Sequence, residues 1–153
     1  MTTPKDGPRS EPELCWDNAP AAFAALEREA FATPWREEDF RDGPDRFHLS
    51  LWRERRCMSF VYGSRILDEV EIWRIATLPD ERAKGLGGRL LGALLEACRQ
   101  WRTRHIFLEV AHRNRAARAL YEKYGFREER RRTAYYGPGN HALILGLDLE
   151  QRT

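Results

Sequence analysis

Hydrophobic residues recur with helical spacing in several segments of this chain. The clearest is 86–101, where apolar side chains three and four positions apart form one face of an amphipathic helix. Residues 20–31 repeat the pattern after a proline suited to a first helical turn, and 34–41 predict a second, short helix. A further helix over 115–124 follows Asn114, a residue type favoured as an N-cap. The pattern therefore predicts four helices.

Segments rich in β-branched and aromatic residues predict strands between these helices. They cover residues 47–52, 57–62, 70–78, 106–110, 126–136 and 142–149. The first two and the last two are separated by turn-forming stretches, so each pair predicts an antiparallel hairpin. Alternation of strand and helix between 70 and 124 instead predicts a central parallel pair. We expect an α/β (α+β) fold with a mixed, mainly antiparallel sheet flanked by helices.

Composition limits the domain organisation and the classes of function. A chain of 153 residues with 42% hydrophobic content is long enough to bury one core, so we expect a single domain over 14–153. Residues 1–13 contain three prolines and almost nothing apolar, which predicts a disordered leader. A net charge of +2 does not favour direct nucleic-acid binding. No apolar run is long enough to predict a membrane span.

The cysteines and histidines do not predict a metal site. Three cysteines without a CxxC pair support neither a disulfide framework nor a zinc module, and they favour a cytoplasmic setting. The four histidines lack the spacing of a metal motif such as HExxH. The Arg-rich stretch 127–132 alternates with glutamates, which favours a solvated strand face over a contact with an acidic partner.

A glycine-rich segment lies between the third predicted strand and the 86–101 helix. It reads Arg82, Ala83, Lys84, Gly85, Leu86, Gly87 and Gly88. Free backbone N–H groups at the start of a helix bind anions, and a phosphate suits this segment. The spacing does not fit a Walker loop or a dinucleotide fingerprint. The alternative is a glycine-rich turn that only starts a helix.

Three polar residues after this helix are candidates for chemistry. Glu109 interrupts an apolar strand, where a carboxylate is costly unless it faces a cleft or a partner, and such a position favours proton transfer. The alternative is an edge-facing or ion-paired residue. Tyr121 shares a helix face with apolar residues, which by itself favours a core aromatic over an acid. Asn114 is explained locally as a helix cap.

In this order and spacing, these residues resemble the GNAT superfamily of acetyl-CoA-dependent N-acetyltransferases. The phosphate loop of that family reads Gln/Arg-x-x-Gly-x-Gly/Ala, which Arg82-x-x-Gly85-x-Gly87 matches. Over residues 30–149 the chain also resembles the bacterial RimI-like branch, which acetylates the N-terminal alanine of a ribosomal small-subunit protein. The segments that carry this resemblance are 31–35, 75–79, 107–110, 114 with 119–126, and 131–132 with 135–136.

The resemblance implies a GNAT-like fold, in which the central parallel strand pair splays to admit acetyl-CoA as co-substrate, and it assigns roles to residues. The backbone of Ile75, Ala76 and Thr77 would bind the acetyl and pantetheine portion, and segment 82–88 the pyrophosphate. Asn114 would contact the thiol arm of the cofactor. Glu109 corresponds to the general base, and Tyr121 to the acid that contacts the cofactor and protonates the departing thiolate. The resemblance implies direct transfer in a ternary complex.

The acceptor implied is a protein or peptide N-terminus, such as that of a ribosomal protein. Trp35 and Tyr136 are candidates for the walls of the acceptor groove, and each is equally explicable as core. An α-amine has an ordinary pKa near ~8 against ~10.4 for lysine, so a modest base suffices for an N-terminus. Two alternatives remain. One is acetylation of an internal lysine or a small amine, and the other is a catalytically silent acyl-CoA-binding domain.

The chain also departs from the branch it resembles. Arg74 and Thr77 stand where the branch usually shows asparagine and valine, beside the expected cofactor site. Asn140-His141 replaces an acidic pair near the expected peptide groove. Loss of acidic residues there lowers the expected preference for a basic second residue in the substrate.

Overall fold

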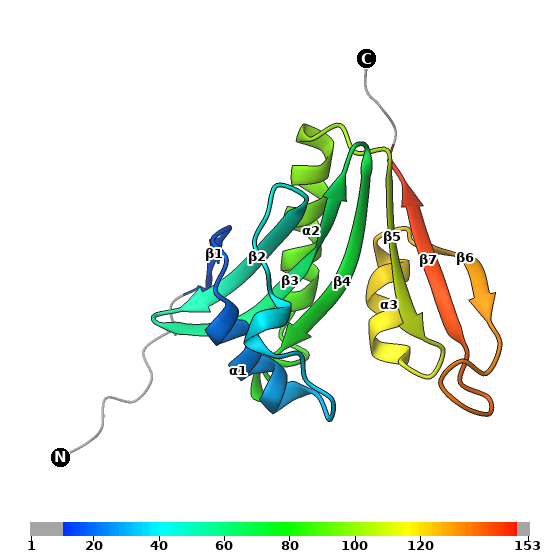
Figure 1. The fold of residues 1–153 in the computed structure, drawn as a ribbon, viewed down its shortest axis with the longest axis horizontal. Coiled ribbons are helices and arrows are strands. Elements are labelled where there is room, and N and C mark those ends of the chain that lie inside the picture. Colours follow the sequence, from blue (N-terminus) through cyan, green and yellow to red (C-terminus); the bar gives the residue numbers. More distant parts are fainter. Residues whose placement is uncertain (1–10, 150–153) are drawn as a thin grey trace.

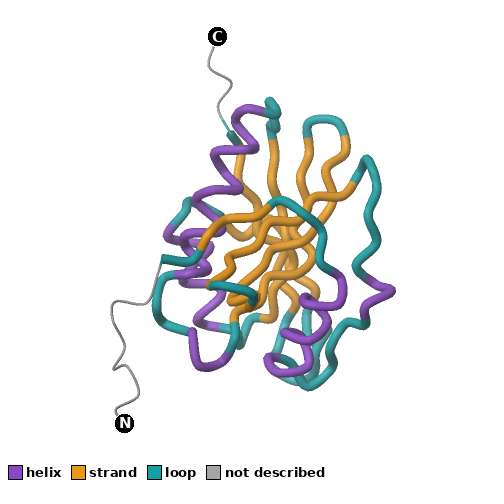
Figure 2. The backbone as a smooth tube through the Cα atoms, turned by 90° about the vertical axis from the view of Figure 1, so that its left-hand side faces the viewer, coloured by secondary structure: helices purple, strands orange, loops and turns teal. Residues whose placement is uncertain are grey.

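Residues 11–149 are described by the computed structural model, and they form a seven-stranded sheet with helices on both faces (Figures 1 and 2). The strands are β1 (Glu13–Cys15), β2 (Arg46–Arg53), β3 (Arg56–Ile66), β4 (Glu69–Thr77), β5 (His105–Ala111), β6 (Arg127–Arg132) and β7 (Ala142–Asp148). The α-helices are α1 (Pro20–Ala30), α2 (Leu86–Gln100) and α3 (Arg115–Lys123), and the 3₁₀ turns are η1 (Glu37–Asp39) and η2 (Pro79–Glu81).

The sheet has the order β1-β2-β3-β4-β5-β7-β6, in which only the β4–β5 pair is parallel within the described residues. This confirms the expected α/β fold with a mixed, mainly antiparallel sheet. α1 packs on one face against β3 and β4, while α2 packs on the other face (Figure 2). No helix within residues 11–149 is long and apolar enough to cross a membrane.

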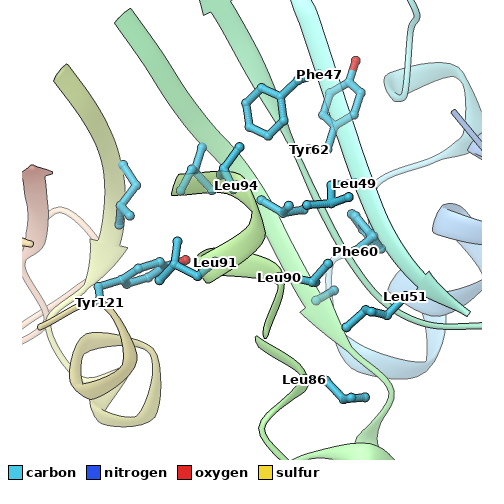
Figure 3. Close-up of a cluster of buried hydrophobic side chains, with 14 of the residues drawn as sticks. Phe47, Leu49, Leu51, Phe60, Tyr62, Leu86, Leu90, Leu91, Leu94 and Tyr121 are labelled. Atoms are coloured by element: carbon cyan, nitrogen blue, oxygen red, sulfur yellow. The ribbon is translucent and has the colours of Figure 1, made fainter. Parts of the chain in front are cut away.

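One layer of the core lies between α2 and the sheet, as the 3.6-residue period predicts, and another lies between α1 and the opposite face of the sheet. Leu86, Leu90, Leu91 and Leu94 of α2 are buried and point toward the strands (Figure 3). Full burial of such a side chain contributes about 1.5–3 kcal/mol. This layer therefore fixes α2, and the glycine-rich segment before it, against β2, β3 and β4.

The central parallel pair diverges. β4 pairs with β5 from Glu69 opposite His105 to Ile72 opposite Leu108. Beyond this point, β4 continues to Thr77 without a partner on its β5 side among the described residues. On its other side β4 stays paired with β3 from Glu69 to Thr77, apart from a bulge at Trp73. The expected divergence of the two strands is therefore confirmed (Figure 1).

Several sequence-based boundaries are wrong. The short helix expected over 34–41 is only the 3₁₀ turn η1, because one isolated turn gains few helical hydrogen bonds for the residues it fixes. The strand expected over 126–136 ends at Arg132, because a turn begins at Thr133 and Ala134 within it has a positive φ of 55°. Residues 1–10 of the expected leader lie outside the described residues, and Glu13 begins β1, one residue before the expected boundary.

Candidate active site

The segment before α2 presents backbone N–H groups at a helix start. Gly85 is the N-cap residue of α2, with φ of 80° in the left-handed region that favours glycine. No side chain caps this end of the helix with a hydrogen bond. A Cβ at Gly85 would meet no atom within 4 Å, so conformation rather than space requires glycine there. The first-turn N–H groups of α2 are thus suited to bind an anion.

The next two glycines let α3 approach α2. A Cβ at Gly87 would lie 3.2 Å from Leu120 Cδ2. The Tyr124 hydroxyl donates a hydrogen bond to the Gly88 carbonyl oxygen at 2.7 Å. These glycines therefore have a packing role in addition to any contact with a phosphate.

Side chains of the same segment hold the loop itself. The Arg82 guanidinium donates to the Ala30 carbonyl at the end of α1, at 3.2 Å. Lys84 Nζ lies 3.1 Å from a carboxylate oxygen of Glu81, which is buried and also pairs with Arg53 at 3.2 Å. The expected anion site is thus built from backbone groups on a loop that a buried carboxylate anchors. Sequence reasoning missed Glu81, because an acidic residue in a polar turn gives no signal of burial.

Glu109 lies on β5, one residue beyond the point where pairing with β4 stops. Its side chain is exposed, while its neighbours Leu108 and Val110 are buried. Alternation turns Glu109 to the open face of β5, so its carboxylate avoids the cost of burial within the apolar strand. The Tyr136 hydroxyl donates a hydrogen bond to Glu109 Oε2 at 2.8 Å.

Tyr136 reaches Glu109 from the turn that follows β6. Its backbone N–H donates to the Asn140 carbonyl, and Asn140 Oδ1 accepts from the backbone N–H of Arg113. These contacts tie the β6–β7 connection to the loop between β5 and α3. Partial burial and the adjacent Glu109 carboxylate raise the pKa of Tyr136 to about 12. Tyr136 is 47% exposed, which rules out the core interpretation of this residue.

Tyr121 and Asn114 lie on α3 and at its start. Tyr121 is buried, its ring lies beside Leu91 of α2, and it meets Phe126 edge-on with centroids 5.6 Å apart (Figure 3). Burial raises the pKa of Tyr121, so its hydroxyl keeps its proton. No hydrogen bond between described residues joins Tyr121 to Glu109. Asn114 Oδ1 accepts from the Ala117 N–H at 3.2 Å, which confirms the predicted helix cap.

Trp35 lies on the α1 side of the sheet, apart from the Glu109–Tyr136 contact. Its ring is partly buried against Phe40 and Tyr62, at centroid distances of 5.3 and 6.0 Å. Its backbone N–H donates to Glu27 Oε1 at 2.9 Å. Sequence reasoning missed the fully buried Glu27, although its place four residues after Phe23 on the apolar face of α1 was a usable signal.

The geometry suits an extended anionic ligand with a reactive end. The α2 N-terminus offers an anion site, the unpaired edge of β4 offers backbone groups, and Glu109 faces the open side of β5. Within residues 11–149, no group of three or more His, Cys, Asp or Glu side chains could hold a metal ion.

Comparison with known proteins shows the family to which this chain belongs. Residues 12–126 match the family described as Acetyltransferase (GNAT) family. The chain belongs to this family. It is 37% identical, over 89% of its length and 95% of the relative, to the [ribosomal protein bS18]-alanine N-acetyltransferase of Salmonella typhimurium. The Escherichia coli K12 enzyme of the same description is 35% identical over 85% of this chain and 90% of the relative.

The solved structures agree with this assignment. The crystal structure of the ribosomal-protein-S18-alanine N-acetyltransferase from Escherichia coli superposes with a TM-score of 0.86 at 29% identity, covering 93% of this chain and 96% of that one. The resemblance inferred from the sequence is therefore confirmed. As a GNAT acetyltransferase, the protein uses acetyl-CoA as acetyl donor, and the anion site at α2 fits the pyrophosphate of that donor.

Proposed function

We propose that this protein transfers the acetyl group of acetyl-CoA to a protein N-terminal α-amine, and that the N-terminal alanine of ribosomal protein bS18 is its acceptor. The observation that carries the proposal is the 37% identity across almost the whole of both chains to an enzyme of that description. The exposed carboxylate of Glu109, beside the divergence of β4 and β5, supports it.

In this proposal the β4 side of the divergence holds acetyl-CoA, which supplies an activated acetyl thioester. The backbone of segment 82–88 binds the pyrophosphate, and the backbone of Ile75, Ala76 and Thr77 binds the acetyl and pantetheine portion. The support is the uncapped start of α2 and the unpaired edge of β4. Asn114, at the start of α3, would contact the thiol arm.

The β5 side carries the proton transfers. Glu109 is exposed to an incoming amine and accepts its proton, directly or through a water. An α-amine ordinarily has a pKa of about 8, so it is already partly neutral at cellular pH and a carboxylate base suffices. Tyr121 keeps its proton because burial raises its pKa, and it supplies that proton to the departing thiolate. Direct transfer then needs no acyl-enzyme.

The extent of the domain, the cellular compartment and the residues that flank the acceptor belong to the same proposal. Residues 14–153 act as one acetyltransferase domain, and the cytoplasm, where ribosomal proteins are made, is the compartment. Trp35 and Tyr136 flank the acceptor, with Tyr136 in contact with Glu109 and Trp35 packed against Tyr62 of β3 and Arg74 of β4.

Mass spectrometry of two peptides and one small amine, each incubated with acetyl-CoA, tests this function. One peptide has the N-terminal sequence of bS18 with lysines replaced, and the other is N-terminally blocked with a single lysine. Acetylation of the first alone supports the proposal. Acetylation of the blocked peptide, or of a small amine alone, contradicts it. Binding of acetyl-CoA without acetylation of any acceptor would indicate a catalytically silent domain.

A further inference from the structure

A buried ion pair lies beside the point where β4 and β5 diverge. Arg74 is two residues beyond Ile72, the last residue of β4 that pairs with β5. Arg74 Nε donates to Glu27 Oε2 at 3.0 Å, and Arg74 Nη2 donates to Glu27 Oε1. Glu27 is fully buried on α1, and the Arg74 side chain is 23% exposed. The pair therefore joins α1 to the unpaired part of β4 through two hydrogen bonds.

An irregularity in β4 directs Arg74 toward α1. Opposite β3, Tyr62 pairs with Arg74 and Gly63 pairs with Ile72, so Trp73 is an extra residue. Such a bulge reverses the alternation of side chains beyond it. A Cβ at Gly63 would lie 2.0 Å from the Glu71 carbonyl oxygen, so only glycine permits this pairing.

The same pair holds the segment 31–35, which connects α1 to η1. Glu27 Oε1 accepts the Trp35 backbone N–H at 2.9 Å. The guanidinium carbon of Arg74 lies 4.7 Å from the Phe31 ring centroid and 5.1 Å from the Trp35 ring centroid, within the range of cation–π contacts. Both ends of the segment thus depend on one carboxylate and one guanidinium.

We propose that Arg74 and Glu27 are positioning residues for the acceptor, because they fix segment 31–35 as one wall of the acceptor groove beside the unpaired edge of β4. This inference rests on the proposed function, in that acetyl transfer takes place at that edge. Glu27 neutralises Arg74, so the wall offers aromatic surface rather than a free charge. It therefore fits an acceptor whose first side chain is small or apolar.

Steady-state kinetics of variants of the full chain test the inference. The double variant Glu27→Gln/Arg74→Asn removes the pair without leaving a buried charge. Arg74→Lys keeps the positive charge but loses the planar guanidinium that donates two hydrogen bonds to the Glu27 carboxylate. Glu96→Gln/Arg99→Asn is the matched control, because it removes an exposed pair on α2 with an N–O distance of 3.6 Å. Thermal unfolding of each variant establishes that it is folded.

We expect the double variant to raise the acceptor KM about tenfold or more, with kcat within about threefold and the acetyl-CoA Kd within about twofold. Arg74→Lys should give an intermediate KM, and the control should match the wild type. An unchanged acceptor KM would overturn the inference. So would parallel losses in acceptor KM, kcat and acetyl-CoA affinity, because they indicate general destabilisation.

The acceptor in this experiment is whichever of three amines the wild type acetylates with the highest kcat/KM: the bS18 N-terminal peptide, the blocked lysine peptide or spermidine. A preference for either of the last two overturns the proposed function but still tests Arg74 and Glu27. Absence of acetylation with all three overturns both.

Discussion

The two strands that diverge at the centre of the sheet are held in different ways. β4 is paired with β3 along its length and is covered by α1 and α2, and Arg74 ties its unpaired part to a buried carboxylate. β5 instead carries Glu109, whose side chain faces solvent. On this side the sheet ends at β6, in which every residue is exposed.

In the proposed function this difference separates two tasks. Backbone groups that bind a cofactor need a fixed geometry, which a buried and paired strand provides. A carboxylate that receives a proton from a macromolecular amine must be reachable, which an exposed strand face provides. Side-chain substitutions on the β4 side should therefore lower the free energy of unfolding, and those on the β5 side should lower kcat.

The largest expected effect is on the β4 side. Leu90→Ala on α2 removes a fully buried side chain and should lower the free energy of unfolding by about 2–5 kcal/mol, measured by urea denaturation. Arg127→Ala on β6 is the exposed control and should stay within about 0.5 kcal/mol of the wild type. Equal losses for the two variants would contradict the comparison.

On the β5 side, Glu109→Gln should reduce kcat about 10²-fold and leave the acetyl-CoA Kd within a few-fold, because it removes only the proposed proton acceptor. Stopped assays of peptide acetylation and calorimetric titration of acetyl-CoA measure the two quantities. Glu122→Gln on the exposed side of α3 is the control and should keep full activity. Wild-type turnover in Glu109→Gln would remove this residue from the mechanism.

Tyr121→Phe should also reduce kcat by roughly 10²-fold while keeping the cofactor affinity within a few-fold. The ring stays in place against Phe126, so only the proton is lost. Tyr124→Phe, which loses the hydrogen bond to Gly88, should change the fold's stability more than kcat. If kcat of Tyr121→Phe equals that of the wild type, another group protonates the thiolate.

Tyr136→Phe should have a smaller effect, about tenfold in kcat/KM, because it removes one hydrogen bond to the Glu109 carboxylate. The pKa of Tyr136 is raised to about 12, so its hydroxyl remains a donor at every pH below that value. The rate ratio of wild type to variant should therefore stay constant between about pH 6 and 10. In a Glu109→Gln background the Tyr136→Phe effect should vanish, and full additivity would show that Tyr136 acts independently of Glu109.

Much of the fold could be predicted because its elements follow strong periodic patterns. The leucines of α2 recur at helical spacing, and Asn114 has local chemistry that specifies a cap. The parallel pair followed from the order of strands and helices. Weaker patterns failed where tertiary contacts decide the outcome, as in the single turn η1 and in the early end of β6 at Arg132.

The candidate site was only partly predictable. Motif spacing identified segment 82–88, but it could not reveal that Arg82 and Lys84 bind protein groups. The contact between Tyr136 and Glu109 joins residues 27 positions apart through a turn whose path depends on Asn140. Glu27 pairs with a residue 47 positions away, and no local pattern connects the two.

The most direct test of the division between the two strands is an amide NMR titration, first with acetyl-CoA and then with the bS18 N-terminal peptide. We expect acetyl-CoA to shift the resonances of segment 82–88 and of Ile75, Ala76 and Thr77, and the peptide to shift those of Glu109 and Tyr136. Acetyl-CoA shifts confined to other parts of the chain, or a peptide that leaves Glu109 and Tyr136 unchanged, would contradict the account.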